Sequence, residues 1–427
     1  MRKPKIAMIV QRYGKGVNGG AEYHCKVLAE QLAHQCDVTV LTSCALDYHV
    51  WENVLPPGEE IIDGIRVLRF PQTGTRNKKV LRRIHRKFRK RRLYQKVLKS
   101  VGLLSAFEHL FPATGIVTEA EEFAWASNQG PYLLELIEFL KDNHHQFDAL
   151  LFFTYLFYPT IYGLRVAPQK SILIPTAHDE PPIYFSIFRK VFDKPKAILF
   201  NTLSERNFIH QRFGNQAIYH DITGVGIDVP KFKRVDVTDF VHPDEPYLIY
   251  IGRIDRGKGC RILFDFFLNF LDKNPSFKHL KLVMVGQKFM DIPASANIVA
   301  TGFVSENLKW SLLESARALV IPSLYESLSL VTLESMAIGV PVIANERCEV
   351  LKNHITDSNG GLLYESYADF EKALFTLFDP IFDLATMKRL AADYVNARYQ
   401  WEPIVEKTMA AIAYVGDGHT AKREINQ

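Results

Sequence analysis

Short hydrophobic runs recur along the whole chain and are separated by stretches with the apolar spacing of amphipathic helices. Because the runs are nearly continuous rather than alternating, they predict buried strands of parallel sheets with helices between them. A chain of 427 residues is too long for one ordinary core, so we expect two α/β domains with Rossmann-like parallel sheets. The strands expected on this basis are 5–10, 37–42, 148–153, 171–175, 196–201, 247–252, 282–286, 298–301, 318–321 and 340–344.

Two further patterns organise the chain. Asp63-Gly64 stands between β-branched residues and predicts a hairpin. The segment that ends near Pro246 is rich in proline and charge, which is typical of a linker. We therefore expect an N-terminal domain over 1–225 and a second domain over 226–400, followed by a helix over 401–416 and a polar tail over 417–427.

The stretch 317–346 holds two carboxylates around an expected helix start near Ser329. The unpaired N–H groups and the dipole of a helix N-terminus attract phosphate, so the amides of Leu330 and Val331 are candidates for a phosphate site. Glu326 precedes this point and Glu334 follows it within the helix. Carboxylates accept hydrogen bonds from hydroxyls, so the pattern fits a ligand with hydroxyls on both sides of a phosphate, such as a nucleotide sugar. The alternative is a buried strand–helix–strand unit with two surface glutamates.

A second loop offers fixed positive charge. Gly252 and Arg253 follow an expected strand, and Lys258-Gly259 precede an expected helix. Glycine lets the turn close, and the two cations can face anionic oxygens.

These motifs together resemble glycosyltransferase family 4, the retaining "glycosyl transferases group 1" type. The resemblance rests on Pro322-Ser323, the pair Glu326 and Glu334, and the run 336–344, together with the loop from Gly252 to Gly259, where Arg256 departs from the usual pattern. It implies the GT-B fold, in which two Rossmann-like domains face a cleft and a C-terminal helix crosses back to the first domain. It also implies transfer with retention of anomeric configuration.

The resemblance carries roles for individual residues. Glu326 would bind sugar hydroxyls and Glu334 ribose hydroxyls, while Arg253 and Lys258 would bind the diphosphate. His178, just after the strand at 171–175, would contact the sugar near the reacting carbon. The remaining donor contacts would come from the glycine loop after the first strand and from the loop that packs on the base: Gly19, Gly20, Phe303 and Val304. The alternatives are an ordinary turn for the glycine loop and a structural role for the histidine.

The sequence favours catalysis without a metal ion. Enzymes that hold a diphosphate through a divalent cation often carry an Asp-x-Asp pair, and this chain has none. Arg253, Lys258 and the helix start could take that role instead. We expect no cofactor, with a UDP- or GDP-sugar as the donor substrate.

Charge is concentrated in one segment. The chain has a net charge of +5, and the stretch 76–99 contains thirteen Lys or Arg residues and no Asp or Glu. Written on a helix, it aligns Val80, Ile84 and Phe88, a pattern that suits adsorption to an anionic membrane surface. A nucleic acid or polyanionic glycan partner and no partner at all are the alternatives; no recognised nucleic-acid module accompanies the run.

The expected location is the cytoplasm, with possible peripheral attachment at the inner face of the membrane. Five scattered cysteines without metal-ligand spacing fit reduced thiols, and the longest apolar run, 149–164, is shorter than a spanning helix requires. The leading hypothesis is a glycosyltransferase of polysaccharide or glycolipid assembly with a glycan or lipid-linked acceptor. The alternatives are a nucleotide-sugar epimerase or phosphorylase of the same fold, and a binding or scaffold protein without catalysis.

Overall fold

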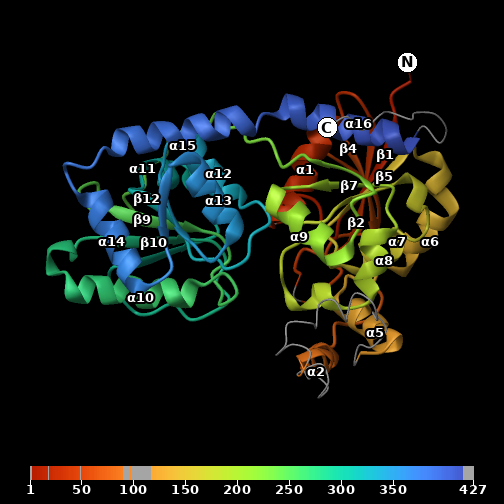
Figure 1. The fold of residues 1–427 in the computed structure, drawn as a ribbon, viewed down its shortest axis with the longest axis horizontal. Helices are drawn as coiled ribbons and strands as arrows, with labels where there is room; N and C mark the ends of the chain where they lie inside the picture. The colour runs from red at the N-terminus through yellow and green to blue at the C-terminus, as the bar shows by residue number, and fades with distance from the viewer. Residues whose placement is uncertain (1, 18, 49, 90–96, 98–116, 417–427) are drawn as a thin grey trace. The chain divides into compact units, whose positions relative to one another are not determined.

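The computed structural model describes residues 2–17, 19–48, 50–89, 97 and 117–416. The chain divides into two compact units (Figure 1). Unit 1 comprises residues 1–224 and 402–427, and unit 2 comprises residues 225–401. The chain thus leaves unit 1 once and returns to it for its last helix.

Unit 1 contains an eight-stranded sheet in the order β3-β4-β2-β1-β5-β6-β7-β8. All neighbouring strands are parallel except β3 and β4. These two form the predicted hairpin, and its turn residues Asp63 and Gly64 both have positive φ, 49° and 81°. The strands are β1 (Lys5–Ile9), β2 (Asp37–Ser43), β3 (Gly58–Ile62), β4 (Ile65–Phe70), β5 (Ala149–Phe153), β6 (Ser171–Ile174), β7 (Ala197–Phe200) and β8 (Tyr219–Ile222).

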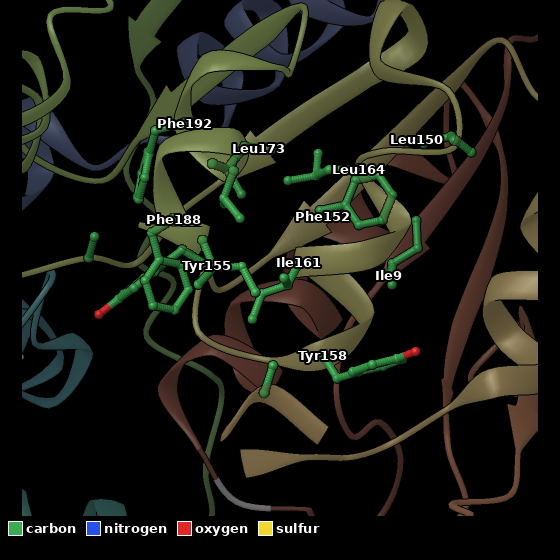
Figure 2. Close-up of a cluster of buried hydrophobic side chains, with 14 of the residues drawn as sticks. Ile9, Leu150, Phe152, Tyr155, Tyr158, Ile161, Leu164, Leu173, Phe188 and Phe192 are labelled. Atoms are coloured by element: carbon green, nitrogen blue, oxygen red, sulfur yellow. The ribbon is translucent and has the colours of Figure 1, made fainter. Parts of the chain in front are cut away.

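Helices α2 and α5 to α9 of unit 1 contribute with this sheet to one large hydrophobic core. Figure 2 shows part of it, where Leu173 of β6 lies near Phe188 and Phe192 of α8, and Phe152 of β5 lies beside Leu164. The helices are α1 (Gly20–Leu32), α2 (Lys78–Arg89), α5 (Glu119–Gln129), α6 (Leu134–Asn143), α7 (Tyr158–Gly163), α8 (Ile187–Asp193), α9 (Leu203–Phe213) and α16 (Trp401–Gly416), with short 3-10 turns η2 (His144–Gln146), η3 (Pro168–Lys170) and η4 (Pro181–Tyr184).

The final helix, α16, contacts the rest of unit 1 through polar and aromatic side chains. Lys407 pairs with Asp221 at 3.0 Å, and the ring of Tyr414 stacks on that of Tyr219 with centroids 4.5 Å apart. The apolar side of the helix, which includes Ile404 and Ile412, is buried.

Unit 2 contains a six-stranded sheet in the order β11-β10-β9-β12-β13-β14, with every neighbouring pair parallel. Its strands are β9 (Tyr247–Ile251), β10 (Lys281–Val285), β11 (Ile298–Gly302), β12 (Ala318–Ile321), β13 (Val342–Asn345) and β14 (Gly361–Tyr364). Figure 1 shows α10 and α14 on one face of this sheet and α12, α13 and α15 on the other. The helices are α10 (Cys260–Lys273), α11 (Glu306–Ser315), α12 (Leu330–Ala337), α13 (Glu349–Ser358), α14 (Tyr367–Phe378) and α15 (Leu384–Arg398), with a 3-10 turn η5 (Pro275–Phe277).

In the described part of the basic segment, the apolar stripe predicted to suit adsorption to a membrane surface packs against the protein instead. Leu81 and Ile84 are buried and belong to the core of unit 1, and Val80 packs against that core. The apolar stripe of α2 therefore faces the protein, and its outer side presents exposed cations such as Arg82 and Arg83. Phe88 and the residues beyond α2 up to 99, apart from Val97, lie outside the part whose side chains are described. None of the helices among the described residues is long and apolar enough to cross a membrane.

Candidate active site

The candidate site of unit 2 lies where its sheet changes direction. From β9, the chain first builds β10 on one side and later β12 on the other. The loops that leave two such strands diverge, which opens a crevice at their carboxyl ends, and ligands of α/β proteins bind there. The loop after β9 carries Arg253 and Lys258, and the loop after β12 carries Glu326. The two motifs identified in the sequence thus follow neighbouring strands.

Glycines allow these loops to approach closely. Gly252 has φ 151°, and Gly286, after β10, has φ 137°. A Cβ on Gly286 would overlap with the carbonyl oxygen of Gly252. Gly259 has φ 79° and caps α10, and a Cβ there would overlap with the carbonyl oxygen of Pro322. Because only glycine combines positive φ with such contacts at low cost, Gly286 and Gly259 bring the three loops together.

The central contact of the site is an ion pair between the two loops. The Nζ atom of Lys258 lies 2.7 Å from Oε1 of Glu326. Both side chains remain partly accessible, at 27% and 15% exposure. An ammonium and a carboxylate that reach solvent can exchange partners with a charged or hydroxyl-bearing ligand. The pair thus provides a cation and a hydrogen-bond acceptor at one place.

Asp255, which the sequence analysis did not single out, organises the loop after β9. Its Oδ1 atom accepts a hydrogen bond of 2.7 Å from the backbone N–H of Lys258, and its Oδ2 atom lies 3.8 Å from Nε of Arg253. The Tyr250 hydroxyl donates to the carbonyl oxygen of Arg253 at 2.7 Å. These contacts hold both predicted cations on a defined turn.

The start of α12 offers the predicted unpaired amides. Ser329 precedes the helix with φ 61° and ψ 69°, a left-handed conformation that is costly for a residue with a Cβ. Its carbonyl accepts from Thr332 and Leu333, which closes the first turn. Among the described residues, none accepts a hydrogen bond from the N–H groups of Leu330 or Val331. The left-handed residue reorients the chain so that the helix begins directly after the loop of Glu326.

Glu334 is a buried carboxylate with one basic neighbour. It is 8% exposed, and its Oε2 atom lies 3.5 Å from Nζ of Lys309, on α11. Burial raises the pKa of Glu334, and the positive charge of Lys309 acts in the opposite direction. Lys309 also contacts Glu306 at 2.8 Å. Sequence reasoning missed Lys309 because it lies on a different helix from Glu334, with no shared motif.

The predicted base-contacting loop follows β11. Gly302 has φ 70°, and Phe303, next to it, is 67% exposed. An exposed aromatic ring directly after a strand is a surface on which a planar base could pack. Val304 is partly buried beside it.

In unit 1, His178 lies beyond the end of β6, as the sequence predicts. Its Nε2 atom is 3.6 Å from Oε2 of Glu180, whose Oε1 atom accepts a hydrogen bond of 2.7 Å from Tyr155. The loop is anchored by Glu205 of α9, which accepts hydrogen bonds from the backbone N–H groups of Ala177 and Asn201. Burial raises the pKa of Glu205 to about 8. Glu180, directly beside the predicted histidine, is a contact that sequence reasoning did not include.

The glycine loop of unit 1 surrounds a buried ion pair. Gly19 precedes α1, and a Cβ on it would overlap with the carboxylate of Glu22. Glu22 accepts hydrogen bonds of 2.9 and 2.7 Å from Nε and Nη2 of Arg12, which also donates to the carbonyl of Leu46 at 2.7 Å. Both charged side chains are 7% exposed. The side chain that comes close to Gly19 is therefore Glu22 of the protein itself. Gly20, in contrast, has open space at its Cβ position.

The comparisons with known proteins agree with this architecture. Sucrose-phosphate synthase from Thermosynechococcus elongatus superimposes with a TM-score of 0.67 at 17% identity, covering 95% of this chain and 98% of that one. Anabaena HepE, solved in complex with UDP and glucose, gives a TM-score of 0.64 at 13% identity over 96% of this chain and 99% of that one. The fold is therefore GT-B, with two Rossmann-like parallel-sheet units.

Sequence comparisons match part of the chain to known glycosyltransferases. Residues 245–379 match the family described as glycosyl transferases group 1. D-inositol 3-phosphate glycosyltransferase from Paenarthrobacter aurescens is 28% identical over 50% of this chain and 56% of its own length. An uncharacterized glycosyltransferase of Methanocaldococcus jannaschii, MJ1607, is 29% identical over 30% of this chain and 34% of its own length. Residues 245–379 are therefore similar to glycosyl transferases group 1, and the chain spans less than two thirds of each of these two curated relatives.

Proposed function

We propose that this protein transfers a sugar from a nucleoside-diphosphate donor to a hydroxyl of a glycan or lipid-linked acceptor. The observation that carries the proposal is the 2.7 Å contact of Lys258 with Glu326 at the switch point of the unit 2 sheet. The adjoining start of α12 adds amides that can bind phosphate. A cation, a carboxylate and a helix start are the groups that an activated sugar requires. The Anabaena neighbour, solved with UDP and glucose, supports a donor of this class.

In the proposed reaction, the bond between the anomeric carbon and the diphosphate oxygen breaks, and a bond from that carbon to the acceptor oxygen forms. The acceptor proton passes to the departing diphosphate, so atoms and charge balance without another reactant. Lys258 and Arg253 would stabilise the negative charge that develops on the leaving group. Attack from the side of departure retains the anomeric configuration, and these cations provide for a reaction without a metal ion.

Lys258 and Glu326 would exchange partners when the donor binds, so the same two residues pair with each other in the free protein and contact the donor in the complex. Without donor, the ammonium of Lys258 is neutralised by Glu326. A bound diphosphate would share the ammonium, which leaves the oxygens of Glu326 for sugar hydroxyls. Glu334 would accept from ribose hydroxyls, with Lys309 to offset its charge. His178 is proposed near the sugar, and Phe303 and Val304 on the base.

The acceptor class and the location are further parts of the proposal. The exposed cations of α2 support attachment to an anionic membrane surface at its cytoplasmic face through charge alone, at about 1 kcal/mol for each residue near the surface. Such attachment should be lost in high salt, because screening weakens it. Flotation with phosphatidylserine vesicles, compared with phosphatidylcholine vesicles, tests this point. The names of the curated relatives make inositol 3-phosphate a necessary member of any acceptor panel.

Calorimetric titration with UDP and GDP in the presence of EDTA tests the donor site. We expect micromolar binding of one nucleotide without metal, and loss of binding in Lys258→Ala. Transfer assays with UDP- and GDP-sugars then test catalysis, and the anomeric configuration of the product tests retention. Binding without transfer to any acceptor would favour a catalytically silent GT-B protein. Absence of binding to both nucleotides would contradict the proposal.

A further inference from the structure

A buried histidine contacts the backbone just before the start of α12. His354 lies on α13 and is 2% exposed. Its Nε2 atom is 2.8 Å from the carbonyl oxygen of Leu328, and its Nδ1 atom is 3.0 Å from the hydroxyl of Tyr394, on α15. The imidazole therefore connects the loop after β12 with two helices behind it.

The chemistry of the partners decides which ring nitrogen carries the proton. A carbonyl oxygen only accepts, so Nε2 donates its N–H to Leu328. Burial lowers the pKa of His354 to about 4, so the ring is neutral at pH 7 and Nδ1 accepts a hydrogen bond from Tyr394. The hydroxyl of Tyr399 lies 3.5 Å from the same nitrogen and 3.4 Å from that of Tyr394. Two tyrosines thus stabilise the tautomer that donates to the loop.

The peptide held by His354 determines how α12 begins. In a trans peptide, the C=O and the following N–H point in opposite directions. Because the Leu328 oxygen points to His354, the N–H of Ser329 points away from it. Rotation of this peptide would break the hydrogen bond and leave both the carbonyl of Leu328 and the Nε2–H of His354 without this partner, which is unfavourable for buried polar groups. The hydrogen bond therefore helps to keep Ser329 at its left-handed φ of 61°.

We propose that His354 is a positioning residue of the donor site. It acts through the Leu328–Ser329 peptide, which it orients so that the first amides of α12 are available to the phosphates of the donor. The part of the inference that concerns the donor rests on the proposed function. The part that concerns the peptide orientation does not, and the two can be tested separately.

The same contacts reach the segments where the chain enters and leaves unit 2. The carbonyl of Tyr399 accepts a hydrogen bond of 2.9 Å from the N–H of Ile227. Gly226, beside it, lies so close to the indole of Trp401 that a Cβ would overlap with the ring. Residues 225 and 401 are the ends of unit 2. Tyr399→Phe therefore tests whether the outer hydroxyl contributes to the order of the loop.

The first experiment is amide hydrogen exchange of the full chain without ligand. His354→Leu removes the donor with little change in volume, whereas His354→Gln can place an amide N–H near the position of Nε2. We expect exchange in 329–333 to accelerate about tenfold in His354→Leu and to stay within about twofold of wild type in His354→Gln. Tyr394→Phe, a milder change that keeps the imidazole, should give an intermediate effect. His24→Leu is the matched control, because it removes another buried histidine, in unit 1.

The second experiment measures binding of UDP and GDP, well below the melting temperature of each variant. We expect His354→Leu to weaken the nucleotide that wild type binds by about tenfold, with affinity restored in His354→Gln and unchanged in His24→Leu. A purely structural role would lower the melting temperature without this pattern.

Three outcomes decide the inference. Wild-type exchange in 329–333 of His354→Leu, or equal acceleration in the Leu and Gln variants, would overturn it. Selective acceleration together with weaker nucleotide binding supports it in full. Selective acceleration in a protein whose wild type binds neither UDP nor GDP would support the peptide orientation and refute the proposed function.

Discussion

The two units place an ion pair after the first strand of each sheet, yet the pairs have opposite properties. In unit 1, Arg12 follows β1 and forms an ion pair with Glu22. Each of these two side chains is 7% exposed. In unit 2, Lys258 follows β9 and contacts Glu326 with both side chains still accessible. A buried ion pair stabilises the fold and is not available to a ligand, because removal of either charge leaves the other buried without a partner. An accessible pair can be divided by a ligand.

This difference supports unit 2 as the unit that would hold the proposed donor. The guanidinium of Arg12 is used by Glu22 and by the carbonyl of Leu46. Among the described residues, Lys258 forms an ion pair with Glu326, and the helix start next to it adds amides available to a ligand. We therefore assign stability to the pair of unit 1 and ligand binding to the pair of unit 2, and the following variants test that assignment.

The largest effect is expected in unit 1. Glu22→Ala leaves the buried guanidinium of Arg12 without its carboxylate, which should lower the free energy of unfolding of unit 1 by about 3 to 5 kcal/mol. Calorimetry and hydrogen exchange in β1 and α1 measure this loss. The double variant Arg12→Met/Glu22→Leu should recover most of it, because no buried charge remains. The exposed pair of Glu59 with Arg66 is the control, and Glu59→Gln should leave the free energy of unfolding nearly unchanged.

The opposite pattern is expected for Lys258. Lys258→Ala should raise the barrier to sugar transfer by about 3 to 4 kcal/mol, a loss of about 10² to 10³ in kcat, because charge on the leaving diphosphate is no longer matched. Its effect on unfolding should stay near 1 kcal/mol, since the pair is partly solvated. Steady-state assays at saturating donor measure the first quantity. Lys372→Ala, the same change at an exposed position on α14, should leave transfer intact; equal rates in both variants would contradict the assignment.

The sequence predicted those parts of the site that depend on residues close together in the chain. A hydrophobic run ends, a glycine or helix start follows, and the polar residues between them must lie at the carboxyl end of a strand. Lys258 and Glu326 could therefore both be predicted as site residues, although they are 68 residues apart in the sequence. The hairpin at Asp63-Gly64 is confirmed for the same reason, since its turn chemistry is local.

Contacts between helices left no such signal. Lys309 of α11 meets Glu334 of α12, and His354 of α13 meets Leu328 in the loop before α12, and no spacing in the chain predicts either contact. The basic segment shows a related limit. Periodicity identifies the apolar side of a helix but not what that side faces, so the stripe of Val80 and Ile84 fitted a membrane equally well, although it packs on the core of unit 1.

A smaller effect should come from the glycine that brings the loops of unit 2 together. Gly286→Ala places a Cβ against the carbonyl of Gly252, so the loops after β9 and β10 must separate. We expect a loss of about 2 kcal/mol in stability, together with weaker nucleotide binding because Arg253 moves with its loop. Gly302→Ala is the matched control for stability, since Gly302 also has positive φ but has open space at the Cβ position. If both variants lose the same stability, the contact with Gly252 is not the cause.

The smallest effect is a pH dependence carried by the buried histidine of unit 1. His24 lies edge-on to Phe153, and burial lowers its pKa from 6.5 to about 3. Between these values the unfolded chain binds a proton that the folded chain does not, so the free energy of unfolding must fall as the pH falls. The limiting slope is about 1.4 kcal/mol per pH unit, beginning below pH 6.5. His24→Leu removes this term, and thermal unfolding of unit 1 at pH 7 and pH 5 should then show a smaller difference than in wild type. The carboxylates are the same in both proteins, so their contribution to the pH dependence cancels in the comparison. An equal pH dependence in wild type and variant would mean that His24 binds a proton as readily in the folded as in the unfolded chain, which would contradict its lowered pKa.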